Sequence, residues 1–230
     1  MRHWFALTIA LGACVTPGLS AQQDAFPHAF PREGAVRILS NAWMDAWEVT
    51  WPVDSPTPMH RHRFDYLGVE LVASQNRLTA PDGQQREIAL EEGRLWFLER
   101  GTTHAETGLS RDPERHAIIV DLKGPVPSAI ENNSGLPSGL TVGTRGPDND
   151  RVSMWHMTWA PARAEPVRFL ERPVAVMFTA DCSIEWTDRD GTRRTQSYRA
   201  GQLELIAAGR SVGIRALNDP AHVVIVEFKR

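Results

Sequence analysis

Apolar residues in this chain come in short runs of four to eight positions, separated by turn-forming residues. Three such runs in the first half are Val69–Val72, Leu95–Leu98 and Ala117–Val120. Runs of this length that are rich in β-branched and aromatic residues predict β-strands. Between two of them, Pro81-Asp82-Gly83 is typical of a hairpin turn in which glycine adopts a positive φ. Because many short strands recur at regular spacing and no helical pattern follows residue 21, we predict an all-β jelly roll or small barrel.

The same pattern occurs twice along the chain. Matching residues lie 108 positions apart, and the separation becomes 106 near the end of each copy. The matched pairs are Trp47/Trp155, Thr50/Thr158, Trp51/Trp159, Thr79/Thr187, Asp82/Asp190, Gly83/Gly191, Arg86/Arg194, Gly93/Gly201, Leu95/Leu203, Gly101/Gly209, His116/His222, Ile119/Ile225, Val120/Val226 and Lys123/Lys229. A constant separation of this kind indicates a duplicated unit. We predict barrels over 35–123 and 151–230, joined by a Pro/Gly-rich linker over 124–150, and we expect the shared tryptophans in core or inter-barrel packing.

The N-terminus differs in character from the rest of the chain. A short positive stretch, the apolar run Trp4–Val15 and the small residues after it predict a secretory signal peptide over 1–21. Residues 22–34 are expected to form a flexible leader or an arm packed at the edge of a barrel. We therefore expect a periplasmic or secreted protein with no transmembrane segment, since the apolar run is too short to span a bilayer. The stretch before Cys14 resembles a lipoprotein box, so acyl anchoring at Cys14 is the alternative.

Charge and cysteine content narrow the classes of partner. The 230 residues carry a formal net charge of −3, and no lysine- or arginine-rich stretch is present in the sequence. This balance makes nucleic acid and anionic membranes poor candidates, and it favours a small-molecule ligand. Removal of the signal peptide leaves Cys182 as the single cysteine, so the fold must be held by its core without an intramolecular disulfide.

Three histidines are present in the first copy and absent from the second. His60 and His62 are spaced i and i+2, which places both side chains on one face of a strand, and His104 follows about 40 residues later. Their counterparts at the 108-residue separation are Arg168, Leu170 and Val212. Folding alone therefore does not require the three imidazoles, and their spacing predicts a metal site. By the same comparison His116, which recurs as His222, is expected to be structural.

These residues resemble the two motifs of the cupin superfamily. The first cupin motif begins HxH, as His60-Arg61-His62 does, and the spacing of Gly93, Gly101 and His104 is similar to that of the second. The resemblance covers nearly the whole chain after the signal peptide and implies a bicupin: two tandem jelly-roll barrels, of which only the first retains the ligands. It also implies one divalent transition metal (zinc, copper, manganese or iron) and makes a homodimer plausible.

The chain departs from the family at the usual fourth ligand. The expected acid falls at Tyr66 or Leu67, and Asp65 lies one residue early, on the opposite face of a strand. We therefore expect a three-histidine site, with Asp65 or Tyr66 as the candidates for a fourth partner. Glu70 shares strand parity with Tyr66 and corresponds to Phe178 in the second copy, which makes Glu70 and Tyr66 the candidate catalytic residues.

Three functions remain open at this stage. The first is a metal-dependent enzyme with oxygenase-type or Lewis-acid lyase or hydrolase chemistry on a small organic substrate. Export favours copper or zinc over iron or manganese, because an exported chain does not draw on the reduced cytosolic metal pool. The second is a non-catalytic cupin module that binds a small ligand or a metal. The third is a metal-free sugar epimerase that uses His62 and Tyr66.

Overall fold

The structure, a computed structural model, describes residues 26–161 and 163–229. The predicted signal peptide, Cys14 and the first residues of the predicted leader lie outside this part of the chain. The described residues form eighteen β-strands in four sheets and no helix, which confirms the predicted all-β class. No helix among them is long and apolar enough to cross a membrane.

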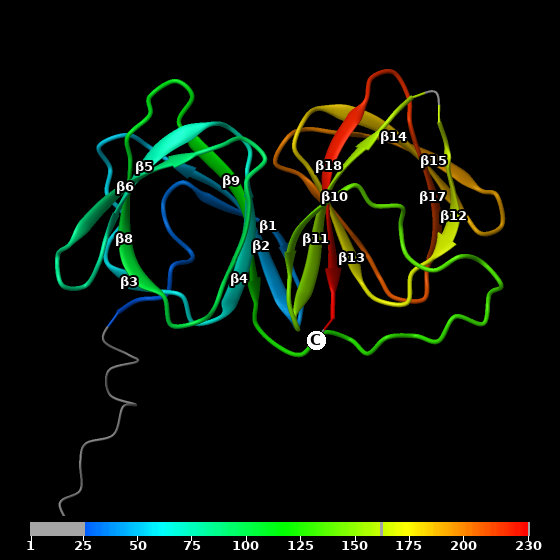
Figure 1. Cartoon of the computed structure of the whole chain (residues 1–230), viewed down its shortest axis with the longest axis horizontal. Helices are drawn as coiled ribbons and strands as arrows, with labels where there is room; N and C mark the ends of the chain where they lie inside the picture. The colour runs from blue at the N-terminus through cyan, green and yellow to red at the C-terminus, as the bar shows by residue number, and fades with distance from the viewer. Residues whose placement is uncertain (1–25, 162, 230) are drawn as a thin grey trace, which may run out of the picture.

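The first barrel is built from two sheets. Their strand orders are β1-β2-β9-β4-β7 and β3-β8-β5-β6, and neighbouring strands pair antiparallel. Figure 1 shows this barrel in blue to green. Its strands are β1 (Ala35–Ser40), β2 (Met44–Trp51), β3 (His60–Arg61), β4 (Asp65–Glu70), β5 (Ser74–Thr79), β6 (Gln85–Leu90), β7 (Leu95–Leu98), β8 (Thr103–Gly108) and β9 (Arg115–Leu122).

The second barrel has the same arrangement. Its sheets have the orders β10-β11-β18-β13-β16 and β12-β17-β14-β15, so each strand takes the place of the strand nine earlier in the chain. The strands are β10 (Thr144–Asp148), β11 (Val152–Trp159), β12 (Glu165–Phe169), β13 (Val174–Phe178), β14 (Cys182–Asp188), β15 (Arg193–Tyr198), β16 (Leu203–Ile206), β17 (Ser211–Ala216) and β18 (Ala221–Phe228). The chain thus contains two jelly-roll barrels, as predicted.

The two barrels share a hydrophobic core between their five-stranded sheets. Met44 and Ile118 of the first barrel and Met154 and Met177 of the second belong to one buried cluster, and none of these side chains is exposed. Figure 1 shows β1, β2 and β4 side by side with β10, β11 and β13. Burial on both faces of its sheet explains why β13 is a continuous apolar run, Val174–Phe178.

Contacts across this interface come in symmetric pairs. A β-carbon at Gly201 would lie 2.5 Å from Glu48 Oε1, and one at Gly93 would lie 3.4 Å from His156 Cε1. Gly93 and Gly201 occupy matching positions in the two barrels, as do Glu48 and His156. Each barrel therefore presents the same surface to the other, which is the geometry of an isologous interface.

The segments before and between the two barrels are packed against them. The residues before β1 line the first barrel, where the Arg61 N–H donates to the Pro27 carbonyl oxygen at 2.8 Å. In the same way the Phe169 N–H donates to the Pro137 carbonyl oxygen at 3.0 Å, and β10 lies inside the segment predicted as linker. Close packing requires glycine at position 143, because a β-carbon there would lie 2.3 Å from the backbone carbonyl oxygen of His156.

The shared tryptophans lie in the cores, as expected. Trp47, Trp51 and Trp159 are almost fully buried, and Trp155 packs against the core of the second barrel. They fill barrel interiors and not the surface between barrels. Aromatic burial at matching positions explains why both copies keep these residues.

Met154→Ala should weaken the joint between the barrels. Truncation of this unexposed side chain leaves a cavity in the shared core, so we expect a loss of about 2–5 kcal/mol in the free energy of unfolding, measured by urea denaturation. Val36→Ala, on the exposed edge strand β1, should change it by less than about 0.5 kcal/mol. Equal effects of the two substitutions would contradict a shared core.

Candidate metal centre

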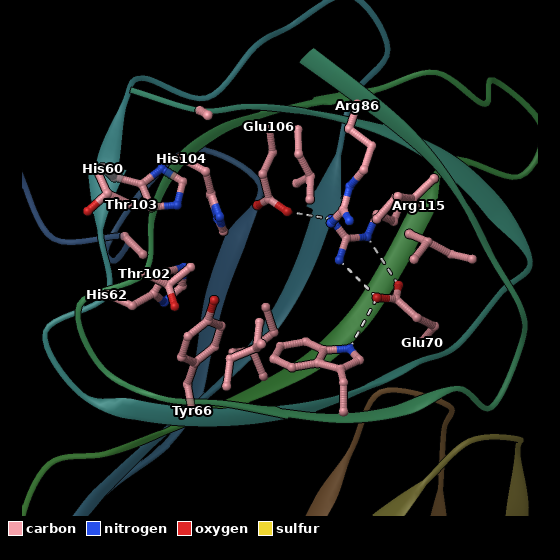
Figure 2. Close-up of a pocket in the computed structure, with 18 of the residues that line it drawn as sticks. His60, His62, Tyr66, Glu70, Arg86, Thr102, Thr103, His104, Glu106 and Arg115 are labelled. Carbon is pink, nitrogen blue, oxygen red and sulfur yellow. Dashed lines mark hydrogen bonds and ion pairs between the residues drawn. The ribbon is translucent and has the colours of Figure 1, made fainter. Parts of the chain in front are cut away.

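Three histidines meet inside the first barrel. His60 lies on β3, His62 follows it, and His104 lies opposite His60 on the neighbouring strand β8. One ring nitrogen from each lies within 4.8 Å of the others, and Figure 2 shows the rings gathered at one side of a cavity. The i, i+2 spacing turns the side chains of His60 and His62 inward. The antiparallel pairing of β3 with β8 brings His104 beside them.

The protonation of these rings suits metal binding. Burial lowers the pKa of all three imidazoles, and burial together with the charges of His104 and His60 lowers that of His62 to about 2. His60 Nδ1 lies 2.9 Å from the Pro58 carbonyl oxygen, so Nδ1 carries the proton and the Nε2 lone pair is free. His62 Nδ1 is buried without a hydrogen-bond partner among the described residues.

This donor set fits a divalent transition metal. Three neutral imidazoles on one side of a cavity match the preference of zinc, copper, iron and manganese for nitrogen ligands. Three protein ligands leave coordination positions open, as catalytic sites do, whereas structural zinc sites are closed by four. His62 Nδ1 is a buried nitrogen without a hydrogen-bond partner among the described residues, and when it is unprotonated its lone pair could bind an ion.

Tyr66 extends the histidine cluster. Its ring stacks on His62, with centroids 3.6 Å apart and planes 2° from parallel. Burial, reinforced by the charge of Glu106, raises the pKa of the Tyr66 hydroxyl, so the group remains an O–H donor at neutral pH. This hydroxyl points into the cavity, close to Thr102, and makes no hydrogen bond of good geometry with the described residues.

Across the cavity, Arg115 joins two buried carboxylates. Its guanidinium donates to Glu70 from Nε at 3.1 Å and from Nη2 at 2.8 Å, and to Glu106 from Nη1 at 2.7 Å. Figure 2 shows the arginine between the two acids, opposite the histidines. We call this set the Arg115 triad. Arg115 lies on β9 and Glu70 on β4 of one sheet, whereas Glu106 lies on β8 of the other, so the triad ties the two sheets together.

Glu106 is held as a carboxylate. Burial opposes its ionisation, but Arg115 and His104 outweigh burial and lower the pKa of Glu106 well below its usual range. Its oxygens also accept from Trp51 Nε1 at 2.9 Å and from Asn76 Nδ2 at 3.2 Å. Because both oxygens of Glu106 already accept hydrogen bonds, Glu106 is placed to orient the cavity wall and not to coordinate an ion.

Glu70 lies where parity predicted, but its partners change its expected role. The side chain is unexposed, faces the cavity and accepts from Arg115 at both oxygens and from Trp96 Nε1 at 3.2 Å. Both oxygens of Glu70 are therefore already occupied by donors of the barrel. The geometry favours Tyr66 over Glu70 as the group that contacts a ligand.

Asp65, the other candidate for a fourth ligand, lies outside the histidine cluster. Its carboxylate accepts from the Arg100 backbone N–H at 3.0 Å and pairs with Arg151 of the second barrel. The reason is strand alternation: Asp65 and Tyr66 are adjacent on β4, so their side chains point to opposite faces. His116 is also remote from the cluster, with Nε2 3.0 Å from Glu48 Oε1, which fits the structural role expected for it.

The second barrel shows what this interior looks like without a site. The strand pairing of the two barrels is the same at the site. The pair His60 and His104 corresponds to the pair Arg168 and Val212. The pair Glu70 and Ala117 corresponds to the pair Phe178 and Val223. Polar residues of the first interior are replaced by apolar residues that belong to the second core. The replacements are His62 by Leu170, Glu70 by Phe178, Asn76 by Ile184, His104 by Val212, Glu106 by Ile214 and Arg115 by Ala221.

Sequence reasoning missed part of this site. Arg115 and Asn76 were not identified, and Glu106 was not among the predicted site residues. The signal that could have found them is the one that found the histidines, because each of the three is polar in the first copy and apolar in the second. A buried charged residue is costly unless it is paired, so a polar-to-apolar difference at a core position marks a group with a specific partner or role.

Comparison with known proteins agrees with the fold. No protein-family profile matches the chain, and no curated protein matches its sequence. Among solved structures, a cupin 2 conserved barrel domain protein from Leptotrichia buccalis has a TM-score of 0.54 at 10% identity, with 85% of this chain and 88% of that one covered.

Bacillus subtilis oxalate decarboxylase, as a single-residue mutant, has a TM-score of 0.57 at 10% identity, covering 100% of this chain and 86% of its own. Lactobacillus farciminis oxalate decarboxylase, in a formate complex, has a TM-score of 0.55 at 12% identity, with 89% of this chain and 88% of that one covered. The B. subtilis enzyme contains Mn(II) centres. The chain therefore has the fold of the cupin superfamily. It has this fold in the two-barrel, bicupin form. Its three clustered histidines could hold a metal ion.

Single alanine substitutions at His60, His62 or His104 should abolish metal binding and leave the fold intact, because the second barrel folds with other residues at these positions. Metal content after equilibration with Zn²⁺ or Mn²⁺, beside circular dichroism, measures both effects. His116→Ala is the matched control: it should keep the metal and lose about 1 kcal/mol of stability, since it removes one hydrogen bond to Glu48. Insoluble protein from all three cluster variants would contradict this reading.

Arg115→Met should be strongly destabilising, by about 3–5 kcal/mol, because it leaves Glu70 and Glu106 buried without their counter-ion. The triple variant Glu70→Phe, Glu106→Ile, Arg115→Ala copies the second barrel and should recover most of that loss. Urea denaturation of both variants checks this. A triple variant as unstable as the single one would show that the triad is not exchangeable for apolar packing.

Proposed function

We propose that this chain is a metal-dependent enzyme that acts on a small organic substrate in the first barrel, in the periplasm or outside the cell. The observation that carries the proposal is the buried, neutral three-histidine cluster at the edge of a cavity of about 530 Å³. Cavities of this size are typical of small-molecule sites. The second barrel, which has Arg168, Leu170 and Val212 at the matching positions, shows that the fold does not need the cluster.

His60, His62 and His104 would hold the metal, through Nε2 in the case of His60. A bound zinc, copper, iron or manganese ion would supply Lewis-acid or redox chemistry at its open positions. The Mn(II) centres of the similarly folded B. subtilis enzyme are consistent with a metal in such a barrel. Oxygenase-type and lyase or hydrolase reactions are the classes that this donor set supports.

The remaining residues position the substrate. The Tyr66 hydroxyl is a buried donor with a free hydrogen-bonding position, so it can donate to a substrate oxygen or hold a proton beside it. The Arg115 triad keeps two carboxylates fixed and charged, which preserves the shape and field of the opposite wall. Residues of both sheets line the cavity, and His60 and His62 are buried in it, away from bulk water.

A non-catalytic ligand-binding module is the second candidate. The observation that favours it is that both interior carboxylates are occupied by Arg115, which leaves Tyr66 as the uncharged group most available for proton transfer. A metal-free epimerase is less consistent with the geometry. Such chemistry needs an acid and a base on opposite faces of a sugar, whereas His62 and Tyr66 lie ring to ring.

Elemental analysis of the exported protein tests the proposal first. We expect about one transition metal per chain, which the triple variant His60→Ala, His62→Ala, His104→Ala lacks, because three nitrogen donors define one site. The loaded protein should then turn over a member of a panel of enols, catechols and thiols, with products identified by mass spectrometry.

Tyr66→Phe separates the enzyme from the binding module. It should keep the metal and lower turnover by about a hundredfold or more, the usual contribution of one positioned hydrogen-bond donor at a developing negative charge. Metal without turnover of any panel compound would favour the binding module. Absence of metal from wild-type protein, even after reloading, would remove the main support for both metal-dependent readings.

A further inference from the structure

The segment before β1 is part of the wall of the cavity. Phe30 is buried and stacks on Trp47, with ring centroids 5.0 Å apart, and Ala29 beside it is also buried. His28 forms a parallel bridge with Arg61, next to the first ligand strand. The residues from 26 to 34, which we call the arm, are therefore fixed against the site and can contribute to its chemistry.

Arg32 is the charged residue that the arm brings into this cavity. Its Nη1 donates to the backbone carbonyl oxygens of Glu33 at 2.7 Å and Thr50 at 3.3 Å, and its guanidinium carbon lies 4.8 Å from the Trp51 ring centroid. These contacts hold the guanidinium in one orientation. Its Nη2 is buried and has no partner in the described part of the chain. The head group thus has one fixed side and one unused donor.

Electrostatics favour an anion at this donor. Burial lowers the pKa of Arg32, with Glu106 acting in the opposite direction, and a guanidinium nevertheless remains charged at neutral pH. Among described residues no carboxylate forms an ion pair with Arg32, because Glu106 is engaged within the Arg115 triad. Arg86 and Arg94 line the same cavity and likewise have no ion pair within 26–161 and 163–229. Three neutral imidazoles add no charge, so any bound divalent ion would increase the positive surplus.

The rest of the cavity wall is largely apolar. The apolar side chains that contribute to it from β5, β6 and β7 are Leu78, Ile88, Leu90, Trp96 and Leu98. A ligand that fits both halves has an anionic head and an apolar body. Planar oxyanions are the groups that a guanidinium recognises best, and a carboxylate is the smallest that also carries an apolar substituent.

We propose that Arg32 is a substrate-binding residue and that the substrate is a carboxylate with an apolar or aromatic body. This inference rests on the proposed function, since it names the substrate class of the same site. Arg32 receives the carboxylate through Nη2, and the body of the substrate lies along the apolar wall. The arm is thereby a specificity element and not a spacer.

Calorimetric titration with benzoate tests the assignment, with benzamide as its neutral analogue. Wild-type protein loaded with Zn²⁺ should bind benzoate and discriminate against benzamide. Arg32→Gln should weaken benzoate binding by about tenfold to a hundredfold, the usual loss for one charged hydrogen-bonded pair, and leave benzamide unchanged. Arg32→Lys keeps the charge without the planar guanidinium, so its benzoate affinity should lie between those of wild type and Arg32→Gln.

Arg189→Gln is the matched control, because it removes the same charge from an exposed hairpin of the second barrel. It should bind benzoate like the wild type, and thermal unfolding verifies that each variant is folded. Equal benzoate affinity in wild type and Arg32→Gln would overturn the proposal, as would no measurable benzoate binding by wild type. Arg32-dependent binding of inorganic phosphate in place of benzoate would also overturn it.

Repeating the titration on chelator-treated protein separates this inference from the metal. Benzoate should bind more weakly without Zn²⁺ and still depend on Arg32. Failure of wild-type protein to take up metal, together with Arg32-dependent benzoate binding, would reject the metal-dependent function and retain the carboxylate site. Metal uptake together with equal benzoate affinity in wild type and Arg32→Gln would retain the metal-dependent function and reject the carboxylate site.

Discussion

The Arg115 triad is the interaction on which the cavity of the first barrel depends. One guanidinium holds carboxylates from both sheets, and it does so where a jelly roll normally places interdigitated apolar side chains. Stacking of Arg115 on Trp51, 3.7 Å from the ring centroid, fixes the group further. Because the sheets are held apart by polar groups of fixed length, a cavity persists between them, and the histidines line its other side.

The second barrel gives the energetic meaning of this arrangement. Replacing a buried ion network by well-packed apolar residues is commonly neutral or stabilising. Phe178, Ile214 and Ala221 show that this fold accommodates such a replacement at the matching positions. The triad is therefore not required for folding as such. Its presence beside three histidines is best explained by the site that it shapes, at the expense of a more stable apolar interior.

Much of this could be predicted from sequence because strand parity and duplication are local properties. Spacing put His60 and His62 on one face, and comparison of the two copies separated them from His116. Parity also explains why Asp65 lies outside the cluster. The partners of Glu70 could not be predicted in the same way, because Arg115 reaches it across strands 45 positions apart, and only the folded register shows which buried charges meet. The packing of the arm and of residues 124–150 could not be predicted from composition, because proline and glycine are frequent both in flexible segments and in closely packed ones.

The symmetric contacts of Glu48 with Gly201 and of His156 with Gly93 have an evolutionary consequence. Two separate chains with this interface would form a homodimer, and every substitution would then appear in both barrels at once. Joining the barrels in one chain removes that restriction. One barrel can exchange its ligands for apolar side chains and serve as a stable partner surface, while the other keeps a polar interior that could not be maintained so easily alone. The paired architecture thus permits a division of labour between a barrel that stabilises and a barrel that binds.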